Sequence, residues 1–180
     1  MRVLTQNGRA DLAYSIASQK TYPSWGYMIG KGATTIWELW NGDTADPAMN
    51  SGNHVMLVGD LLIWFVENLA GIKPDPEQPG FKHILMRPEP VGDLDWVKAS
   101  HRSPFGLIQS EWEKKSGVFR WRLTVPVNAT ATVHVPATSE ESVTESGGRA
   151  STALGVKSLG FKDGRASFQI GSGTYLFEAR

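Results

Sequence analysis

The sequence predicts an α + β protein of more than one domain, in which helices come first and an antiparallel β-sandwich follows. Apolar residues recur at helical spacing as far as Ala70, and at every second position from about Lys82 onward. Between these parts, residues 73–80 read KPDPEQPG, and three prolines in eight residues are typical of an extended linker. We therefore expect a helical domain over residues 1–72, a linker over 73–81 and a β-sandwich domain over 82–180.

Composition excludes several classes of function. The 18 Lys and Arg residues balance 18 Asp and Glu residues, so neither a nucleic acid nor an anionic membrane is expected as a partner. There is no cysteine, and the four histidines lie far apart, so we expect no metal site and no other cofactor. Residues 1–8 lack the apolar stretch of an export signal, which leaves a cytoplasmic location as the default expectation.

The helical part begins with a short amphipathic helix over residues 8–20, GRADLAYSIASQK. Pro23 ends it, because the residue before a proline is disfavoured in the α conformation. Ser24 is a suitable N-cap for a further turn or two through Ile29, and Gly30 breaks that element.

A long helix is predicted from about Asn53 to Ala70, with Ser51 or Asn53 as N-cap and Gly71 as the stop. Apolar residues lie almost all around it, so it must be buried on most sides. Asp60 interrupts the apolar run, as do two later polar residues, which argues against a membrane span. We expect Asp60 to satisfy neighbouring polar groups in the core.

The β-sandwich is predicted from alternation. Residues 118–125 place Phe119, Trp121, Leu123 and Val125 on one face, and residues 127–135 alternate in the same way. Asp163-Gly164 is a tight-turn sequence, and residues 140–148 read as a polar loop. Further strands are predicted at residues 82–87, 95–101, 107–114, 153–159, 166–170 and 174–178.

One carboxylate has an unusual setting. Glu38 follows Trp37 directly and precedes Trp40 by two residues. The β-branched run at residues 34–36 favours an extended backbone, so we place Glu38 on an extended loop. An ionised carboxylate beside apolar rings loses solvation, and sugar sites combine aromatic faces with such an acid. The pattern also allows the simpler interpretation in which the aromatic residues are core and Glu38 points to water.

Residues 41–50 are rich in Asn, Gly, Asp and Pro and read as a surface loop. Asp43 and Asp46 are expected to be solvated turn carboxylates there.

Five sequence blocks carry a resemblance to a known family. In order they are YPSWGYMI, KGATTIWELW, MNSGNH, LAGI and PGFKHILMRPEP. Their order and spacing, from about Asn7 to Pro126, resemble the C-terminal part of the α-L-rhamnosidases of glycoside hydrolase family 78. The resemblance implies the last helices of a partial α/α barrel followed by a β-domain, and a rhamnoside or rhamnose-containing glycan as substrate.

The resemblance also implies roles for individual residues. Glu38 corresponds to the family's general base, and His54 to a histidine that contacts sugar hydroxyls. Trp37 or Trp40 would pack against the sugar or seal the pocket, and Tyr22 and Trp25 would support its wall. The family's general acid lies upstream of every residue present here.

Three functional hypotheses follow. In the first, the chain is the C-terminal portion of an inverting α-L-rhamnosidase, inactive alone, with its helices covered by an upstream barrel region or by self-association. In the second, it is a non-catalytic carbohydrate-binding or scaffold module built on the β-sandwich. In the third, it is a self-sufficient enzyme that uses Asp43, Asp46 or Asp60 as its second acid.

Overall fold

The computed structural model describes all 180 residues, which form two compact units, Met1–Phe65 and Val66–Arg180. The first unit is helical, and the second consists of two β-sheets, so the predicted α + β class is confirmed. No helix has the length and apolar character needed to cross a membrane.

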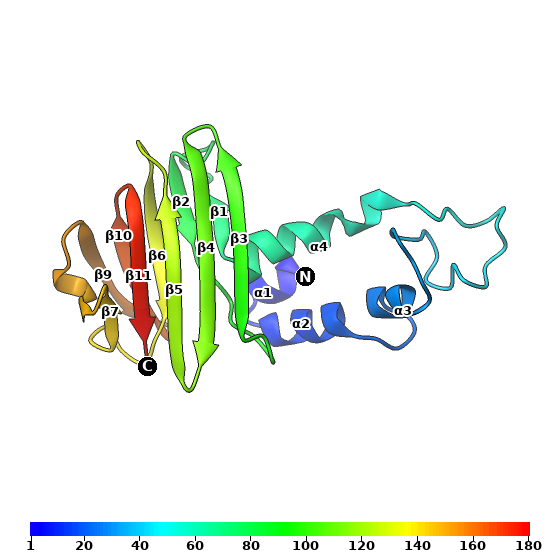
Figure 1. The fold of residues 1–180 in the computed structure, drawn as a ribbon, viewed down its shortest axis with the longest axis horizontal. Helices are drawn as coiled ribbons and strands as arrows, with labels where there is room; N and C mark the ends of the chain where they lie inside the picture. Colours follow the sequence, from blue (N-terminus) through cyan, green and yellow to red (C-terminus); the bar gives the residue numbers. More distant parts are fainter. The chain divides into compact units, whose positions relative to one another are not determined.

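Three short helices open the first unit: α1 (Arg2–Gln6), α2 (Ala10–Ser18) and α3 (Trp25–Gly30) (Figure 1). The amphipathic helix predicted over residues 8–20 is α2. Ser24 caps α3 as predicted, since its hydroxyl accepts a hydrogen bond of 2.9 Å from the Tyr27 N–H. Helix α1 was not predicted, because its five residues have neither a side-chain cap nor an apolar face long enough to recognise.

The long predicted helix is a continuous run of three kinds of helical turn. A 3₁₀ turn, η1 (Val55–Val58), leads into α4 (Gly59–Trp64), and a π-type turn, η2 (Phe65–Leu69), ends it. The helix therefore begins two residues later than predicted. The proposed N-caps are used elsewhere, because the Asn53 side chain accepts a hydrogen bond from the Thr35 hydroxyl.

The prediction for Asp60 is wrong. Its side chain is 54% exposed and pairs with the Arg2 guanidinium of α1 at 2.8 Å. One turn further along α4, the buried Trp64 donates from Nε1 to the Thr5 hydroxyl at 2.8 Å. These contacts hold α1 against α4, and Asp60 takes part from the surface rather than from a core.

The helix is also less buried than its composition predicts. Within the first unit only Leu61 and Trp64 of this helix are buried. The exposed apolar side chains of the same run are Val55, Met56, Leu57, Leu62, Ile63 and Phe65. The first unit thus lacks the partner surface that such a helix requires.

The second unit packs two sheets face to face. One has the strand order β1-β2-β6-β10-β9, and its pairs are antiparallel except β2 with β6, which is parallel. Its strands are β1 (Ile72–Pro74), β2 (His83–Met86), β6 (Thr130–Pro136), β9 (Val156–Lys162) and β10 (Arg165–Ile170).

The other sheet has the order β3-β4-β5-β11-β7-β8 and is antiparallel throughout. The last strand along the chain, β11, lies between β5 and β7 (Figure 1). The strands are β3 (Trp96–Ser103), β4 (Gly106–Lys115), β5 (Val118–Val125), β7 (Val143–Glu145), β8 (Gly148–Arg149) and β11 (Gly173–Ala179), with a 3₁₀ turn η3 (Ala150–Thr152) before β9.

Alternating apolar residues fill the space between the sheets, as predicted. Phe168 of the first sheet stacks on Phe177 of the second, with ring centroids 5.7 Å apart. The largest side chains of this core are fully buried: Trp112, Trp121, Phe168, Phe177, Ile84, Met86, Ile108 and Leu123. The second unit therefore has a complete hydrophobic core of its own.

Two side chains of β4 hold the end of the helix within this unit. Trp112 donates from Nε1 to the Leu69 carbonyl at 2.8 Å, and the Ser110 hydroxyl donates to the Ala70 carbonyl at 2.6 Å. These bonds satisfy carbonyls that a helix C-terminus leaves free. Gly71 then takes a φ of +75°, as expected of the predicted stop.

Several predicted boundaries differ from the structure. Lys73 and Pro74, assigned to the linker, lie in β1, where proline is tolerated because β1 is an edge strand. The polar loop at 140–148 contains β7 and the start of β8, joined by a turn at Ser146-Gly147 in which both residues have positive φ. The strand predicted at 153–159 begins only at Val156, because Gly155 has a φ of +77°.

Candidate active site

The candidate site lies in the first unit, where two stretches of the segment between α3 and η1 run side by side. The Glu38 N–H donates to the Ser51 carbonyl at 2.9 Å, and the His54 N–H donates to the Ile36 carbonyl at 2.7 Å. Glu38 is outside any helix or strand, in keeping with the predicted loop. This backbone pairing brings residues 16 positions apart, Glu38 and His54, to the same place.

The Glu38 carboxylate has one fixed oxygen. Its Oε2 accepts a hydrogen bond of 3.1 Å from the Ser51 N–H and lies 3.7 Å from His54 Nδ1. The second distance is within ion-pair range for a protonated imidazole but too long for a hydrogen bond. The side chains of Glu38 and His54 are 42% and 29% exposed, so a small molecule can reach both.

The predicted aromatic residues form two separate pairs. Trp25 and Trp40 meet edge to face with ring centroids 5.6 Å apart, and Tyr22 meets Tyr27 in the same way at 5.2 Å. Trp40 and Tyr22 remain 40% and 55% exposed. In each pair, one ring is accessible to a ligand and is held in place by the other ring.

Trp37 belongs to neither of these pairs, although it precedes Glu38 directly in the sequence. Its ring lies against the backbone of Gly42, where an added Cβ would come within 2.7 Å of the indole. Trp37 is partly buried there, and it supports the turn that follows the acid.

The two aspartates of the loop are engaged locally. Asp43 accepts a hydrogen bond from the Tyr27 hydroxyl at 3.1 Å and forms an ion pair with Lys31 at 3.5 Å. Desolvation and the Asp43 carboxylate raise the pKa of the Tyr27 hydroxyl. Asp46 caps a turn by accepting from the Ala48 N–H at 2.9 Å.

Sequence reasoning did not single out the residues that shape the Glu38 loop. Asn50 Oδ1 accepts from the Leu39 N–H at 3.1 Å, and both backbone groups of Ser51 bond to Glu38. Backbone donors have no residue-type signal. The polar MNSGNH block was the one available hint, and within it only His54 was assigned to the site, whereas Ser51 was considered as a helix N-cap.

Comparison with protein families divides the chain at nearly the same point as the fold. Residues 1–69 match the model described as the bacterial alpha-L-rhamnosidase 6 hairpin glycosidase domain. Residues 71–150 match the bacterial alpha-L-rhamnosidase C-terminal domain.

Individual proteins match almost the whole chain. An alpha-L-rhamnosidase of Streptomyces avermitilis is 37% identical over 97% of this chain, and one of Formosa agariphila is 34% identical over 99%. The match covers only 16% and 19% of those two proteins. The chain thus spans less than a fifth of the length of these relatives.

Solved structures agree with this result. A crystal structure of the Streptomyces avermitilis alpha-L-rhamnosidase complexed with L-rhamnose gives a TM-score of 0.89 at 35% identity, over 99% of this chain and 17% of that one. The alpha-L-rhamnosidase from Dictyoglumus thermophilum gives 0.86 at 38% identity, over 98% of this chain and 20% of that one.

Proposed function

Because this chain belongs to the α-L-rhamnosidase family and corresponds to its C-terminal part, we propose that Glu38 is the general base of an inverting hydrolysis of terminal α-L-rhamnosyl residues. The observation that carries the proposal is the Glu38 carboxylate, oriented by a backbone N–H and lying 3.7 Å from His54, in the region matched to the glycosidase domain.

The reaction requires two carboxyl groups on opposite faces of the sugar, about 6.5–9.5 Å apart. Glu38 accepts a proton from water as the water oxygen bonds to the anomeric carbon. The bond from that carbon to the leaving oxygen breaks, and the second acid protonates this oxygen. The second acid would come from a region upstream of this chain. In support, the chain covers only 16% of the Streptomyces avermitilis relative.

The neighbouring side chains would bind the sugar. His54 can donate to or accept from a ring hydroxyl, because an imidazole offers both functions. The exposed rings of Trp40 and Tyr22 would form the pocket wall against the apolar face of the sugar, with Trp25 behind Trp40. Trp37 would seal the loop from below, since its ring covers Gly42.

The chain would be inactive alone. The uncovered apolar residues of α2 and of the helix from Val55 to Phe65 require a partner surface, which an upstream barrel region or a second copy would supply. The purified 180-residue chain should therefore not hydrolyse a chromogenic rhamnoside. Measurable turnover would instead favour a self-sufficient enzyme with a second acid from this chain.

The direct test is Glu38→Gln in the full-length enzyme, with Asp46→Asn as the matched control because Asp46 only caps a turn. We expect kcat for a chromogenic rhamnoside to fall by roughly 10²–10⁴-fold or more for Glu38→Gln and to stay near normal for the control. Added azide should partly restore turnover by replacing the activated water. Near-normal kcat in Glu38→Gln would remove Glu38 from the mechanism.

A further inference from the structure

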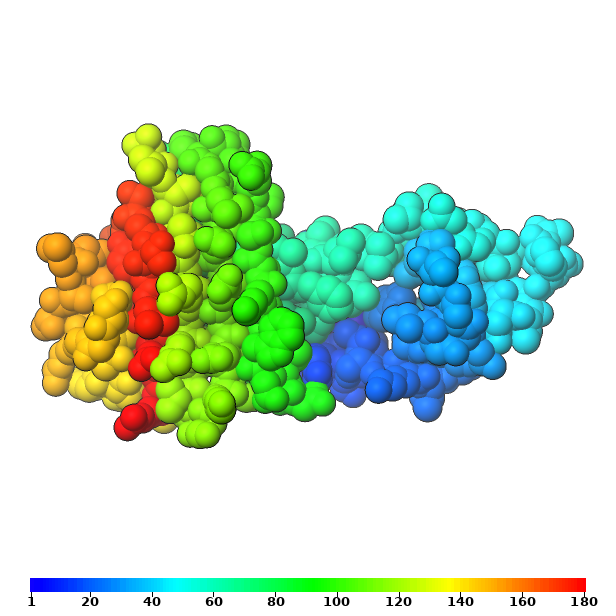
Figure 2. Space-filling model, in the orientation of Figure 1, coloured from blue at the N-terminus to red at the C-terminus, as the bar shows by residue number.

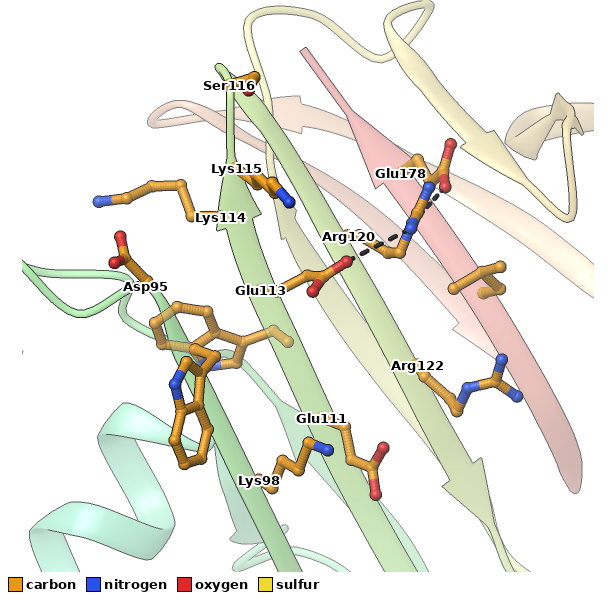
Figure 3. Close-up of a pocket in the computed structure, with 13 residues that line it drawn as sticks. Asp95, Lys98, Glu111, Glu113, Lys114, Lys115, Ser116, Arg120, Arg122 and Glu178 are labelled. Carbon is orange, nitrogen blue, oxygen red and sulfur yellow. Dashed lines mark hydrogen bonds and ion pairs between the residues drawn. The ribbon is translucent and has the colours of Figure 1, made fainter.

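A broad hollow lies on the outer face of the second sheet, entirely within the second unit. It has a volume of about 1090 Å³ and is lined by side chains of β3, β4, β5 and β11 (Figure 3). The space-filling view shows this face as a continuous surface of β4, β5 and β11 (Figure 2). Nothing in the proposed hydrolysis uses it.

Strand register arranges the lining side chains in two rows. The first row runs Trp96, Glu113, Arg120 and Glu178 across the four strands, and the second runs Lys98, Glu111, Arg122 and Leu176. Residues two apart in a strand share a face, so both rows point outward. The labelled members of the two rows project from the same side of the sheet in Figure 3.

The first row combines a fixed charge network with a free indole. Arg120 pairs with Glu178 at 2.6 Å and with Glu113 at 3.3 Å, which holds all three side chains. Trp96, at the end of the row, is 62% exposed, whereas Trp112 and Trp121 of the same sheet are buried. A solvent-exposed indole beside a hollow can stack on the flat apolar face of a ligand.

The second row offers unused polar groups. Glu111 lies between Lys98 and Arg122 in the register, yet no ion pair joins them within 4.0 Å. A carboxylate accepts hydrogen bonds at two neighbouring oxygens, and a guanidinium donates hydrogen bonds from two neighbouring N–H groups. Both arrangements match two adjacent hydroxyls of a sugar ring.

We propose that this face is a second glycan-binding site, in which Trp96 stacks on a sugar ring and Glu111 and Arg122 bind hydroxyls of a neutral oligosaccharide. The class of ligand rests on the proposed function, because the substrate is itself a glycan. The lining has four carboxylates, Asp95, Glu111, Glu113 and Glu178, and five basic side chains, Lys98, Lys114, Lys115, Arg120 and Arg122. Charges of both signs therefore nearly balance, which favours a neutral ligand over a polyanion. The many Lys and Glu side chains also differ from a protein interface core, where both are depleted.

The test uses the full-length enzyme carrying Glu38→Gln, so that a hexasaccharide of α-linked rhamnose is bound without being consumed. Calorimetry should show saturable binding that changes little between low and high salt. Trp96→Ala should weaken it about tenfold or more, and Arg122→Ala should weaken it as an independent variant. The matched control is Phe161→Ala, a similarly exposed aromatic residue on the other sheet.

Hydrolysis separates this proposal from the catalytic one. Trp96→Ala in the otherwise unaltered enzyme should leave kcat/KM for a small chromogenic rhamnoside unchanged. Hexasaccharide affinity equal to that of the parent in both Trp96→Ala and Arg122→Ala would overturn the second site, as would an equal loss in Phe161→Ala. Retained hydrolysis by Glu38→Gln would count against the proposed base and not against this site.

Discussion

The two units differ in how far they bury their apolar residues. Of the 27 buried apolar residues, 22 lie in Val66–Arg180, whereas 14 of the 20 exposed large apolar side chains lie in Met1–Phe65. The second unit closes its own core between two sheets, and the first leaves a helix uncovered. Apolar residues therefore have opposite meanings in the two units: in one they build a core, and in the other they mark a surface that requires a covering partner.

The largest expected effect comes from separating the units. Residues 66–180 should unfold cooperatively, because they keep the core and the bonds from Trp112 and Ser110 to the helix end. Residues 1–65 alone should show no cooperative transition, since too little of their apolar surface is buried. Thermal melts followed by near-UV circular dichroism would compare the two pieces, and a sharp transition in 1–65 would contradict the comparison.

Two tryptophan truncations sharpen the contrast. Trp121 is fully buried and donates from Nε1 to Ser110 at 2.9 Å, so Trp121→Ala should cost about 3–5 kcal/mol. Trp40→Ala, at a ring that is 40% exposed, should cost about 1 kcal/mol or less. Urea unfolding of the 180-residue chain measures both, and similar losses would show that the first unit is better packed than its exposure indicates.

A pH effect is expected from one histidine of the second unit. Burial, together with the charges of Arg87 and Arg165, lowers the pKa of His134 to about 4, while its ring bonds to the Ser167 hydroxyl at 2.8 Å. Its pKa is about 6.5 when unfolded. The unfolded chain then binds more protons in this window, so stability should fall as pH drops from about 6.5 to about 4.

His134→Gln should remove part of that fall. The urea midpoints of variant and parent should be compared between about pH 6.5 and about pH 4. Their difference reports on His134 and cancels the contribution of carboxylates that titrate in the same pH range. Parallel curves for the two proteins would mean that His134 does not contribute.

The smallest effect is expected at the surface of the first unit. Asp60→Asn breaks the pair with Arg2, but Asp60 is 54% exposed, and exposed pairs contribute about 0–1 kcal/mol. Thermal unfolding should therefore change little. A loss as large as that of Trp121→Ala would mean that α1 is held mainly by this one ion pair.

The sequence was most informative where one physical pattern dominates. Alternation in residues 118–125 and the cap at Ser24 correctly predicted β5 and α3. Prediction from the sequence failed where contacts with residues distant in the chain decide the local structure. β7 contains a single buried apolar residue, Val143, and owes its place to pairing with β11, and the start of the long helix shifts because Asn53 bonds to Thr35.

The candidate site was predictable to a similar extent. Residue type and family resemblance singled out Glu38 and His54, and the structure brings the two side chains together. The bonds that do so are backbone bonds of Ser51 and Ile36, which no pattern of side chains encodes. For the same reason the separate packing of Trp37 on Gly42 was not foreseen.

The central place of β11 has a consequence for how this region is made. In the order β5-β11-β7, a strand formed by residues 173–179 bridges two strands that leave the ribosome earlier. A chain that ends between Glu145 and Gly173 contains β5 and β7 but lacks the strand that pairs with both, and the unpaired edges invite association with other chains. A truncation that removes β11 should therefore be as harmful as one in the middle of the sandwich.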